Sequence, residues 1–210
     1  THAPRPVPVV SSWGLTETAP AVTTTHGGDI QPAAIGTPLP GAELKLVPAD
    51  GKLEIRVRGP MLFPGYLDEP GANAEAFDDE GFFRTGDAVT WIDPADPNQG
   101  LRFDGRLAED FKLLSGTRIN ALELRLRLLY HLTGLVRDVV VVGSDRDDVG
   151  LLVFPADPSV ALSAPYRDAV RAALSDANDA AGGGSSRRVA RATILADPPS
   201  LDAGEVTDKG

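Results

Sequence analysis

The spacing of apolar residues changes near residue 106 of this 210-residue chain, and this change limits the possible folds most strongly. From about residue 33 to 105, short apolar runs such as LKLV, KLEIRVRG and LRFDGR alternate with glycine, proline and aspartate. Such runs are typical of short strands in a small barrel or sandwich. Beyond them, ALELRLRLLYHL (121–132) repeats leucine at helical spacing. The sequence therefore predicts a β-rich unit followed by a unit of helices and strands.

The second unit is expected to be a compact layer of helices on a sheet. Helices are predicted over 121–132 and 164–181, and the second has a proline near its start. Apolar runs predict strands over 136–144, 149–156 and 189–197, of which the first two are expected to be buried. The fold class predicted for the whole chain is α+β.

Composition excludes several classes of function. The chain has no cysteine and only three histidines, which excludes thiolate zinc sites and cysteine nucleophiles and argues against a histidine-rich metal cage. The net charge is −10, so we expect no nucleic-acid partner. No apolar run approaches the roughly 18 residues that span a bilayer. With no signal-peptide pattern either, we expect a cytoplasmic protein without a membrane span.

Two stretches in the first unit carry candidate chemistry. SSWGLTETAP (11–20) combines backbone amides and hydroxyls that suit an anion with a carboxylate that suits Mg²⁺, although such a pair is also common as a capping device. FFRTGDAV (82–89) places Asp87 after a glycine, where a fixed carboxylate can accept hydrogen bonds from both hydroxyls of a ribose. A plain Gly-Asp turn is the alternative.

Two further stretches carry basic residues. In FDGRLAEDFKLLSGTRIN (103–120), Arg106 follows a glycine and can hold a phosphate or ribose oxygen; the alternative is a charged hairpin between domains. In AGEVTDKG (203–210), Lys209 is one of only four lysines in the chain. A solvated tail is the alternative there.

The order of these motifs is more specific than any one of them. GLTE, PGYLDEP (64–70), FRTGD, DGR with SGTRI, and a terminal Thr-x-Lys-Gly follow one another along the chain. This ordered set resembles the acyl-adenylate-forming superfamily, which contains AMP-binding acyl-CoA synthetases, luciferases and peptide-synthetase adenylation domains. The sequences of three stretches are most similar to those of feruloyl-CoA synthetases and related aryl-CoA ligases: SSWGLTETAP, GRLAEDFKLLSGT and LDAGEVTDKG.

The resemblance implies a domain division and a reaction. Residues 1–106 would be the β-rich, distorted barrel-like end of a large AMP-binding domain, and 107–210 a small mobile α+β domain. Such enzymes join a carboxylic acid to ATP with the help of Mg²⁺, giving an acyl-adenylate and pyrophosphate. They then transfer the acyl group to the thiol of coenzyme A and release AMP.

The resemblance also implies roles for single residues. Thr16 would contact the α-phosphate and Glu17 would hold Mg²⁺. Trp13 and Gly14 would border the adenine and the acyl pocket, although the family usually has tyrosine in place of this tryptophan. Asp87 would bind the ribose hydroxyls.

Two basic residues complete the implied nucleotide site. Arg106 would contact the ribose and help to position the phosphate. Lys209 would neutralise charge as the carboxylate attacks the α-phosphate. A lysine and Mg²⁺ in a closed site lower such a barrier by preorganised electrostatics.

The small domain of the family swings between the two half-reactions. The resemblance places the hinge after the Gly-Arg pair, and it places the tunnel for CoA around LLSGTRI. Many members have aspartate or lysine where this chain has Ala108. The implied hinge is Leu107, Ala108, Glu109 and Asp110, and the implied tunnel residues are Leu114, Ser115 and Gly116.

The chain departs from the family in what it lacks. The glycine-, serine- and threonine-rich phosphate loop and most of the acyl pocket lie upstream of the Thr-Glu motif in the family. We therefore expect a fragment that is inactive alone, whose partners are the missing N-terminal part, ATP, CoA and a small carboxylic acid of hydroxycinnamic type. Two alternatives stay open: an adenylation domain that loads a carrier protein, and a non-catalytic nucleotide-binding remnant.

Overall fold

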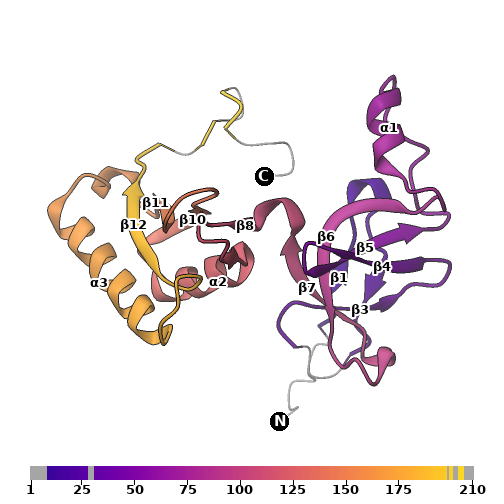
Figure 1. Cartoon of the computed structure of the whole chain (residues 1–210), viewed down its shortest axis with the longest axis horizontal. Coiled ribbons are helices and arrows are strands. Elements are labelled where there is room, and N and C mark those ends of the chain that lie inside the picture. Colours follow the sequence, from indigo (N-terminus) through magenta and orange to yellow (C-terminus); the bar gives the residue numbers. More distant parts are fainter. Residues whose placement is uncertain (1–8, 28–30, 198, 201–202, 206–210) are drawn as a thin grey trace, which may run out of the picture. The chain divides into compact units, whose positions relative to one another are not determined.

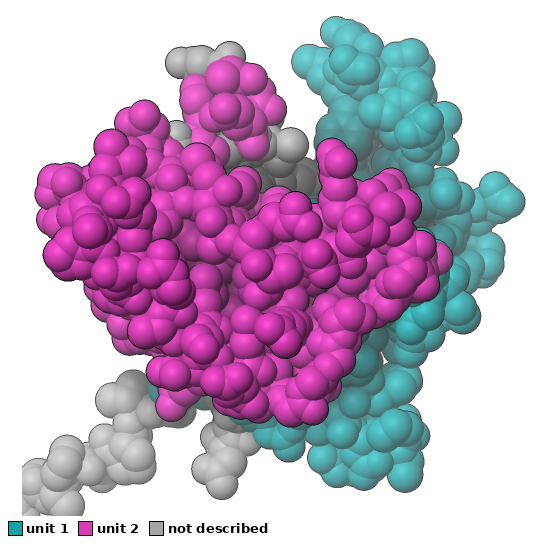
Figure 2. All heavy atoms as spheres, turned by 60° about the vertical axis from the view of Figure 1, so that its left-hand side comes forward, with its two compact units in different colours: residues 1–108 teal, residues 109–210 magenta. Residues whose placement is uncertain are grey.

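The computed structural model describes residues 9–27, 31–197, 199–200 and 203–205. The chain divides into two compact units, residues 1–108 and 109–210, which Figure 2 shows in different colours. Each unit has a hydrophobic core of its own. In the described part of the chain, no helix has the length and apolar character needed to cross a membrane.

The first unit is built on one antiparallel sheet of seven strands (Figure 1). Its spatial order is β1-β2-β3-β7-β6-β5-β4. Ile55, Val57 and Val89 of the central strands are fully buried and form the centre of the core. The strands are β1 (Ser12–Trp13), β2 (Thr23–Thr24), β3 (Ala34–Pro38), β4 (Glu43–Ala49), β5 (Lys52–Arg58), β6 (Phe83–Trp91) and β7 (Leu101–Arg106).

This sheet is open, which revises the barrel-like expectation. Among the described residues, β1 pairs only with β2 and β4 pairs only with β5. Closure needs two edge strands that can pair along their length, and β1 has only two residues. The strand signals between 33 and 105 are otherwise confirmed by β3 to β7, and the α+β fold class holds.

One helix of the first unit was not expected from the sequence. Helix α1 (Pro70–Ala76) projects from the sheet (Figure 1) and starts with Pro70, where the missing N–H has no helical partner to lose. It buries none of its residues. A helix without a buried face leaves no apolar period in the sequence, so the pattern gave no sign of it. Two short 3₁₀ turns, η1 (Thr16–Thr18) and η2 (Pro97–Gln99), complete the unit.

The second unit packs two helices against a three-stranded sheet of order β10-β11-β12. Asn120 and Ser163 cap the helices by accepting hydrogen bonds from Glu123 N and Tyr166 N. The elements are the small hairpin β8 (Phe111–Lys112) and β9 (Arg118–Ile119), then α2 (Ala121–His131), β10 (Val136–Val142), β11 (Val149–Pro155), η4 (Pro158–Val160), α3 (Ala164–Ala180) and β12 (Val189–Ile194).

The expectation of a buried strand at 136–144 is wrong in its burial. Strand β10 is an edge strand, and Val140 and Val142 on it are 43% and 36% exposed. Strand β11 lies between β10 and β12, so both of its edges are paired and Val149, Leu151 and Val153 reach the core. Two valine-rich runs thus differ in burial because of their place in the sheet.

Candidate functional site

Two predicted site residues of the first unit, Trp13 and Arg106, contact a third, the buried carboxylate of Asp87. Asp87 lies on β6 opposite Arg106 of β7, and it is 2% exposed. Its Oδ2 accepts a hydrogen bond from Nε1 of Trp13 at 2.9 Å, and its Oδ1 lies 3.5 Å from Nε of Arg106. A buried carboxylate is stable only with such partners. The fold therefore brings together Trp13, Asp87 and Arg106, which are far apart in the sequence.

These three residues border a pocket of about 360 Å³, a volume in the range of small-molecule sites. Gly14 lines it as well, and Ile35 and Phe103 give it an apolar wall. The side chain of Arg106 is 33% exposed, so part of its guanidinium remains accessible. Two larger hollows of the chain, of about 960 and 680 Å³, contain none of the predicted site residues.

The turn that carries Glu17 follows directly on this pocket wall. Thr16 is exposed, whereas Glu17 is 6% exposed and accepts a hydrogen bond from the Tyr66 hydroxyl at 2.9 Å. The Thr18 side chain closes the turn by accepting from Leu15 N at 2.7 Å. Only glycine fits at position 14, because a Cβ there would lie 1.6 Å from the carbonyl oxygen of Pro20.

Tyr66 is a site residue that sequence reasoning missed. It belongs to PGYLDEP, which entered the motif order without a role. The side-chain amide of Asn73 holds it in place, because Oδ1 accepts from Tyr66 N at 2.6 Å and Nδ2 donates to Tyr66 O at 2.8 Å. Burial and the hydrogen bond to Glu17 raise the pKa of Tyr66. No sequence signal links a tyrosine to a glutamate 49 positions away.

Glu17 is compatible with the predicted role toward Mg²⁺. Among the residues that the structure describes, no cluster of three or more histidine, aspartate or glutamate side chains is arranged for a metal ion. Mg²⁺ in nucleotide sites needs only one or two protein carboxylates, since substrate phosphates and water supply the other ligands. One buried, oriented carboxylate therefore fits such an ion when the nucleotide brings it.

The predicted hinge residues lie where the two compact units divide. Leu107, Ala108 and Glu109 form a 3₁₀ turn, η3 (Leu107–Glu109), and the division falls between Ala108 and Glu109. Asp110 accepts a hydrogen bond from Ala121 N at 3.1 Å, which fixes it to the start of α2. Rotation at these residues stays a prediction.

The predicted CoA-tunnel residues form the tip of the β8–β9 hairpin. Leu114 is 65% exposed there, and Ser115 donates a hydrogen bond to the Thr117 hydroxyl at 2.9 Å. Gly116 has φ +79°, a conformation that glycine adopts at little cost. Lys209 lies outside the described residues, and its role stays a prediction.

Comparison with known proteins identifies the family of both units. Residues 2–67 match the family model of the AMP-binding enzymes, and residues 110–210 match the model of the AMP-binding enzyme C-terminal domain. The chain belongs to the AMP-binding enzyme superfamily. The first match covers the Trp13–Glu17 region, and the second covers the unit of α2 and α3.

Curated relatives of this chain carry several activities in their names. A malonate–CoA ligase of Arabidopsis thaliana is 32% identical over 146 residues, which are 68% of this chain and 23% of the relative. Luciferin 4-monooxygenase of Photinus pyralis is 34% identical over 148 residues (67% and 26%), and a chloroplastic long-chain-fatty-acid–acyl-carrier-protein ligase of Arabidopsis thaliana is 28% identical over 160 (69% and 22%). The chain spans about a quarter of the length of these relatives.

Solved structures show the same fold. The A domain of a carboxylic acid reductase from Segniliparus rugosus, in complex with AMP and a co-purified carboxylic acid, gives a TM-score of 0.71 at 23% identity over 93% of this chain and 31% of that one. O-succinylbenzoate coenzyme A synthetase from Bacillus subtilis, in complex with AMP, gives 0.66 at 22% identity over 93% and 39%. These likenesses confirm the predicted fold class.

Proposed function

We propose that the chain is part of an AMP-forming ligase that activates a carboxylic acid with ATP and transfers the acyl group to CoA. The observation that carries the proposal is the buried Asp87 carboxylate, held by Trp13 and Arg106 at a pocket of about 360 Å³. A carboxylate fixed in this way is a double acceptor for the vicinal hydroxyls of a ribose. Membership of the AMP-binding enzymes supports the same ligand.

The proposed reaction has two balanced steps. A carboxylate oxygen of the acid attacks the α-phosphorus of ATP, and the bond to the bridging oxygen breaks as pyrophosphate leaves. The CoA thiolate then attacks the acyl carbonyl, and AMP leaves with the electrons of the broken carbon–oxygen bond. Mg²⁺ at the phosphates would supply charge neutralisation during the first step.

Each predicted residue has a task in these steps. Asp87 would fix the ribose, and Arg106 would orient ribose and phosphate. Glu17, whose carboxylate accepts a hydrogen bond from the Tyr66 hydroxyl, would hold Mg²⁺. Thr16 is exposed on η1, and its assigned task is to contact the α-phosphate. Lys209 neutralises the charge that develops as the acid attacks, and rotation at 107–110 exchanges it for the hairpin tip at Leu114–Gly116.

The proposed substrate is an aromatic acid of hydroxycinnamic type, because three stretches of the sequence are similar to feruloyl-CoA synthetases. A carrier-protein thiol is the second candidate acceptor, and the relative named as an acyl-carrier-protein ligase favours it. We also propose that the 210 residues alone turn over no substrate. A second proposal is that the protein is located in the cytoplasm. AMP release by the purified chain with ATP, Mg²⁺, aromatic acid and CoA would disprove the first of these statements.

Nucleotide binding by the purified chain tests the proposed site directly. AMP and 2′,3′-dideoxy-AMP are titrated into wild type and Asp87→Asn, with ligand-observed NMR as the readout. We expect wild type to prefer AMP roughly tenfold, since hydrogen bonds to a charged acceptor are lost in the dideoxy analogue. Asp87→Asn should lose most of this preference, whereas Asp168→Asn, an exposed change in the second unit, should keep it. Equal affinity of wild type for both ligands contradicts the ribose role.

Turnover is tested on the full-length gene product that carries this chain. Pyrophosphate release is measured with ATP, Mg²⁺ and a panel of hydroxycinnamic, benzoic, dicarboxylic and fatty acids, with CoA or a carrier protein as acceptor. Release with an aromatic acid that is lost in Lys209→Ala supports both substrate and lysine. Release with none of the acids from a folded protein removes the support for an aromatic substrate and favours the carrier-loading or non-catalytic alternative.

A further inference from the structure

Besides Asp87 and Glu17, the first unit has a further buried carboxylate that has no task in the proposed reaction. Glu54 on β5 is 6% exposed and does not line the pocket of Asp87. Its Oε1 accepts a hydrogen bond from Gly86 N at 3.2 Å, and its Oε2 accepts one from Nε of Arg56 at 2.8 Å. It is therefore bonded to the residue that directly precedes Asp87.

The backbone around Asp87 needs such support because β6 bulges there. Glu54 pairs with Ala88 and Arg56 pairs with Arg84, so the three residues 85–87 face the single residue Ile55. A bulge leaves backbone groups without ladder partners, and buried ones must be satisfied elsewhere. Gly86 sits in it at φ +71°, which a residue with a side chain adopts only with strain.

Two side chains replace the missing ladder bonds of the bulge. The Thr85 hydroxyl accepts from Asp87 N at 3.1 Å and donates to Ile55 O at 2.5 Å. Glu54 accepts from Gly86 N, as described above. Thr85 thus holds the backbone of Asp87, and Glu54 holds that of Gly86. Together these two bonds fix the direction in which the Asp87 side chain leaves the strand.

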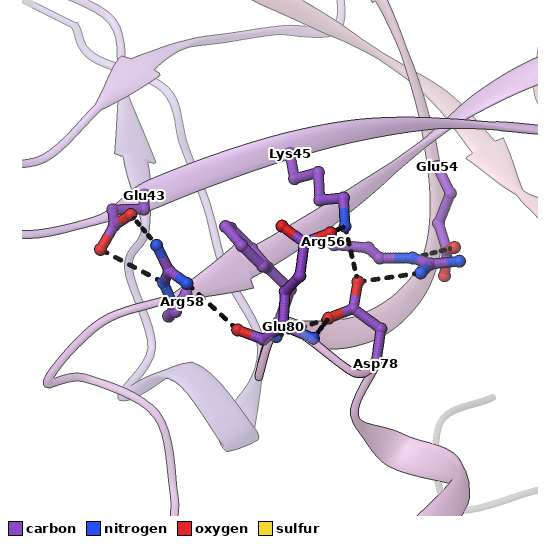
Figure 3. A network of polar contacts seen from close by, with 8 residues as sticks. Glu43, Lys45, Glu54, Arg56, Arg58, Asp78 and Glu80 are labelled. Carbon is purple, nitrogen blue, oxygen red and sulfur yellow. Dashed lines mark hydrogen bonds and ion pairs between the residues drawn. The ribbon is translucent and has the colours of Figure 1, made fainter.

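Arg56, which donates a hydrogen bond to Glu54, is itself fixed by Asp78. Arg56 donates through Nη1 to Oδ2 of Asp78 at 3.0 Å, and Lys45 lies 3.2 Å from the same oxygen. Figure 3 shows Glu54, Arg56 and Asp78 in series. The other oxygen of Asp78 accepts from the backbone N–H groups of Glu80 and Phe82, both at 3.0 Å. The Glu54 carboxylate therefore has one orientation rather than several.

We propose that Glu54 is a positioning residue for Asp87: by accepting the Gly86 N–H it sets the bulge that aims the Asp87 carboxylate at the ribose hydroxyls. This inference rests on the proposed function for its ligand. The bond from Trp13 to Asp87 gives a readout that needs no ligand, since the indole N–H senses where the carboxylate lies.

The test compares three variants of the purified chain. Glu54→Ala removes the acceptor. Glu54→Gln keeps a carbonyl oxygen for Gly86 N–H. Glu54→Asp keeps the charge for Arg56 but retracts the acceptor by one methylene, so it gives a readout if the alanine variant does not fold. Glu43→Ala is the control, because it removes an exposed carboxylate on the neighbouring strand β4.

The first readout is the ratio of the dissociation constants for 2′,3′-dideoxy-AMP and AMP. We expect Glu54→Ala and Glu54→Asp to lower this ratio about three- to tenfold through weaker AMP binding alone, while Glu54→Gln and Glu43→Ala leave it near the wild-type value. A purely structural role would weaken both ligands equally. An unchanged ratio in a folded Glu54→Asp variant overturns the proposal.

The second readout is the indole N–H resonance of Trp13, recorded without nucleotide in a Trp91→Phe background that leaves one indole. It should shift in Glu54→Ala and Glu54→Asp and stay in place in Glu54→Gln. No shift in a folded Glu54→Asp variant overturns the positioning role. If wild type does not distinguish the two nucleotides but the indole shifts, the ribose role fails and the support of Asp87 by Glu54 stands.

Discussion

The indole N–H of Trp13 donates to Oδ2 of Asp87 at 2.9 Å, across 74 positions of the sequence. This bond joins the edge strand β1 to the bulge of β6, and both residues line the pocket. Asp87 cannot move without leaving an indole N–H or a carboxylate oxygen buried without this partner. The position of the Asp87 carboxylate is therefore tied to that of the Trp13 indole in the absence of a ligand.

Trp13→Phe should keep the apolar contact but lose the donor. Removing one partner of a buried polar pair costs about 1–3 kcal/mol, so we expect a loss of this size in the free energy of unfolding from urea titration. AMP should bind several-fold more weakly. Trp91→Phe is the matched control, since Trp91 is 37% exposed and its change should stay within about 0.5 kcal/mol. Equal effects of the two variants would contradict the role of this bond.

Gly14→Ala should disrupt the turn that leads to Glu17. The new Cβ would lie 1.6 Å from Pro20 O, so the backbone must shift, and we expect destabilisation beyond about 2 kcal/mol. AMP binding should fall with it. Gly71→Ala in α1 is the control: a Cβ there meets nothing within 4 Å, and alanine should be neutral or stabilise by up to about 1 kcal/mol. A tolerated Gly14→Ala would show that this turn is adaptable.

Tyr66 should make the first unit sensitive to alkaline pH. Burial and Glu17 raise its pKa in the folded state, so the stabilisation is complete below the unfolded value near pH 10 and is lost as the pH rises through the folded value. Unfolding free energies between pH 9 and 11 should fall less steeply in Tyr66→Phe than in wild type. Burial also raises the pKa of Tyr166, and Tyr166→Phe serves as the comparison in the second unit. An unchanged slope in Tyr66→Phe refutes the linkage.

Asp78 should govern part of the acid sensitivity. Burial alone would raise the pKa of its carboxyl, but the Phe82 N–H, Arg56 and Lys45 together hold it well below the usual range. The stabilisation is therefore present above the unfolded value of about 3.9 and is lost as the pH falls below it. Asp78→Asn should flatten the fall in stability below about pH 4, measured by thermal unfolding. The exposed Glu80→Gln should change it much less, and the reverse order would disprove the assignment.

Periodicity predicted the elements that bury one face. Helix α2 and helix α3 follow the expected ranges within one residue, because their leucines and valines point to a core. Helix α1 buries nothing and left no pattern. The burial of β10 depends on its place at the edge of the sheet. A valine-rich run does not indicate where in the sheet its strand will lie.

In the candidate site, only the residues to which the ordered motifs gave a role could be predicted from the sequence. Trp13, Asp87 and Arg106 were predicted and do meet, whereas Tyr66 and Glu54 were not given roles. Both act through partners more than thirty positions away, Glu17 for Tyr66 and Gly86 for Glu54. In the sequence, Glu54 is one polar residue in an alternating strand, and only pairing with the β6 bulge makes it a buried support.

The bulge has a consequence for recombination between related genes. Glu54, which supports the Gly86 N–H, lies on β5, and Asp87 lies on β6, with residues 59–82 between the two strands. A crossover within that segment joins the support from one parent to the carboxylate of the other, and it separates Glu17 from Phe83–Trp91 in the same way. Shuffled libraries that take residues 13–106 from one parent should therefore retain nucleotide recognition far more often than libraries with crossovers inside this range.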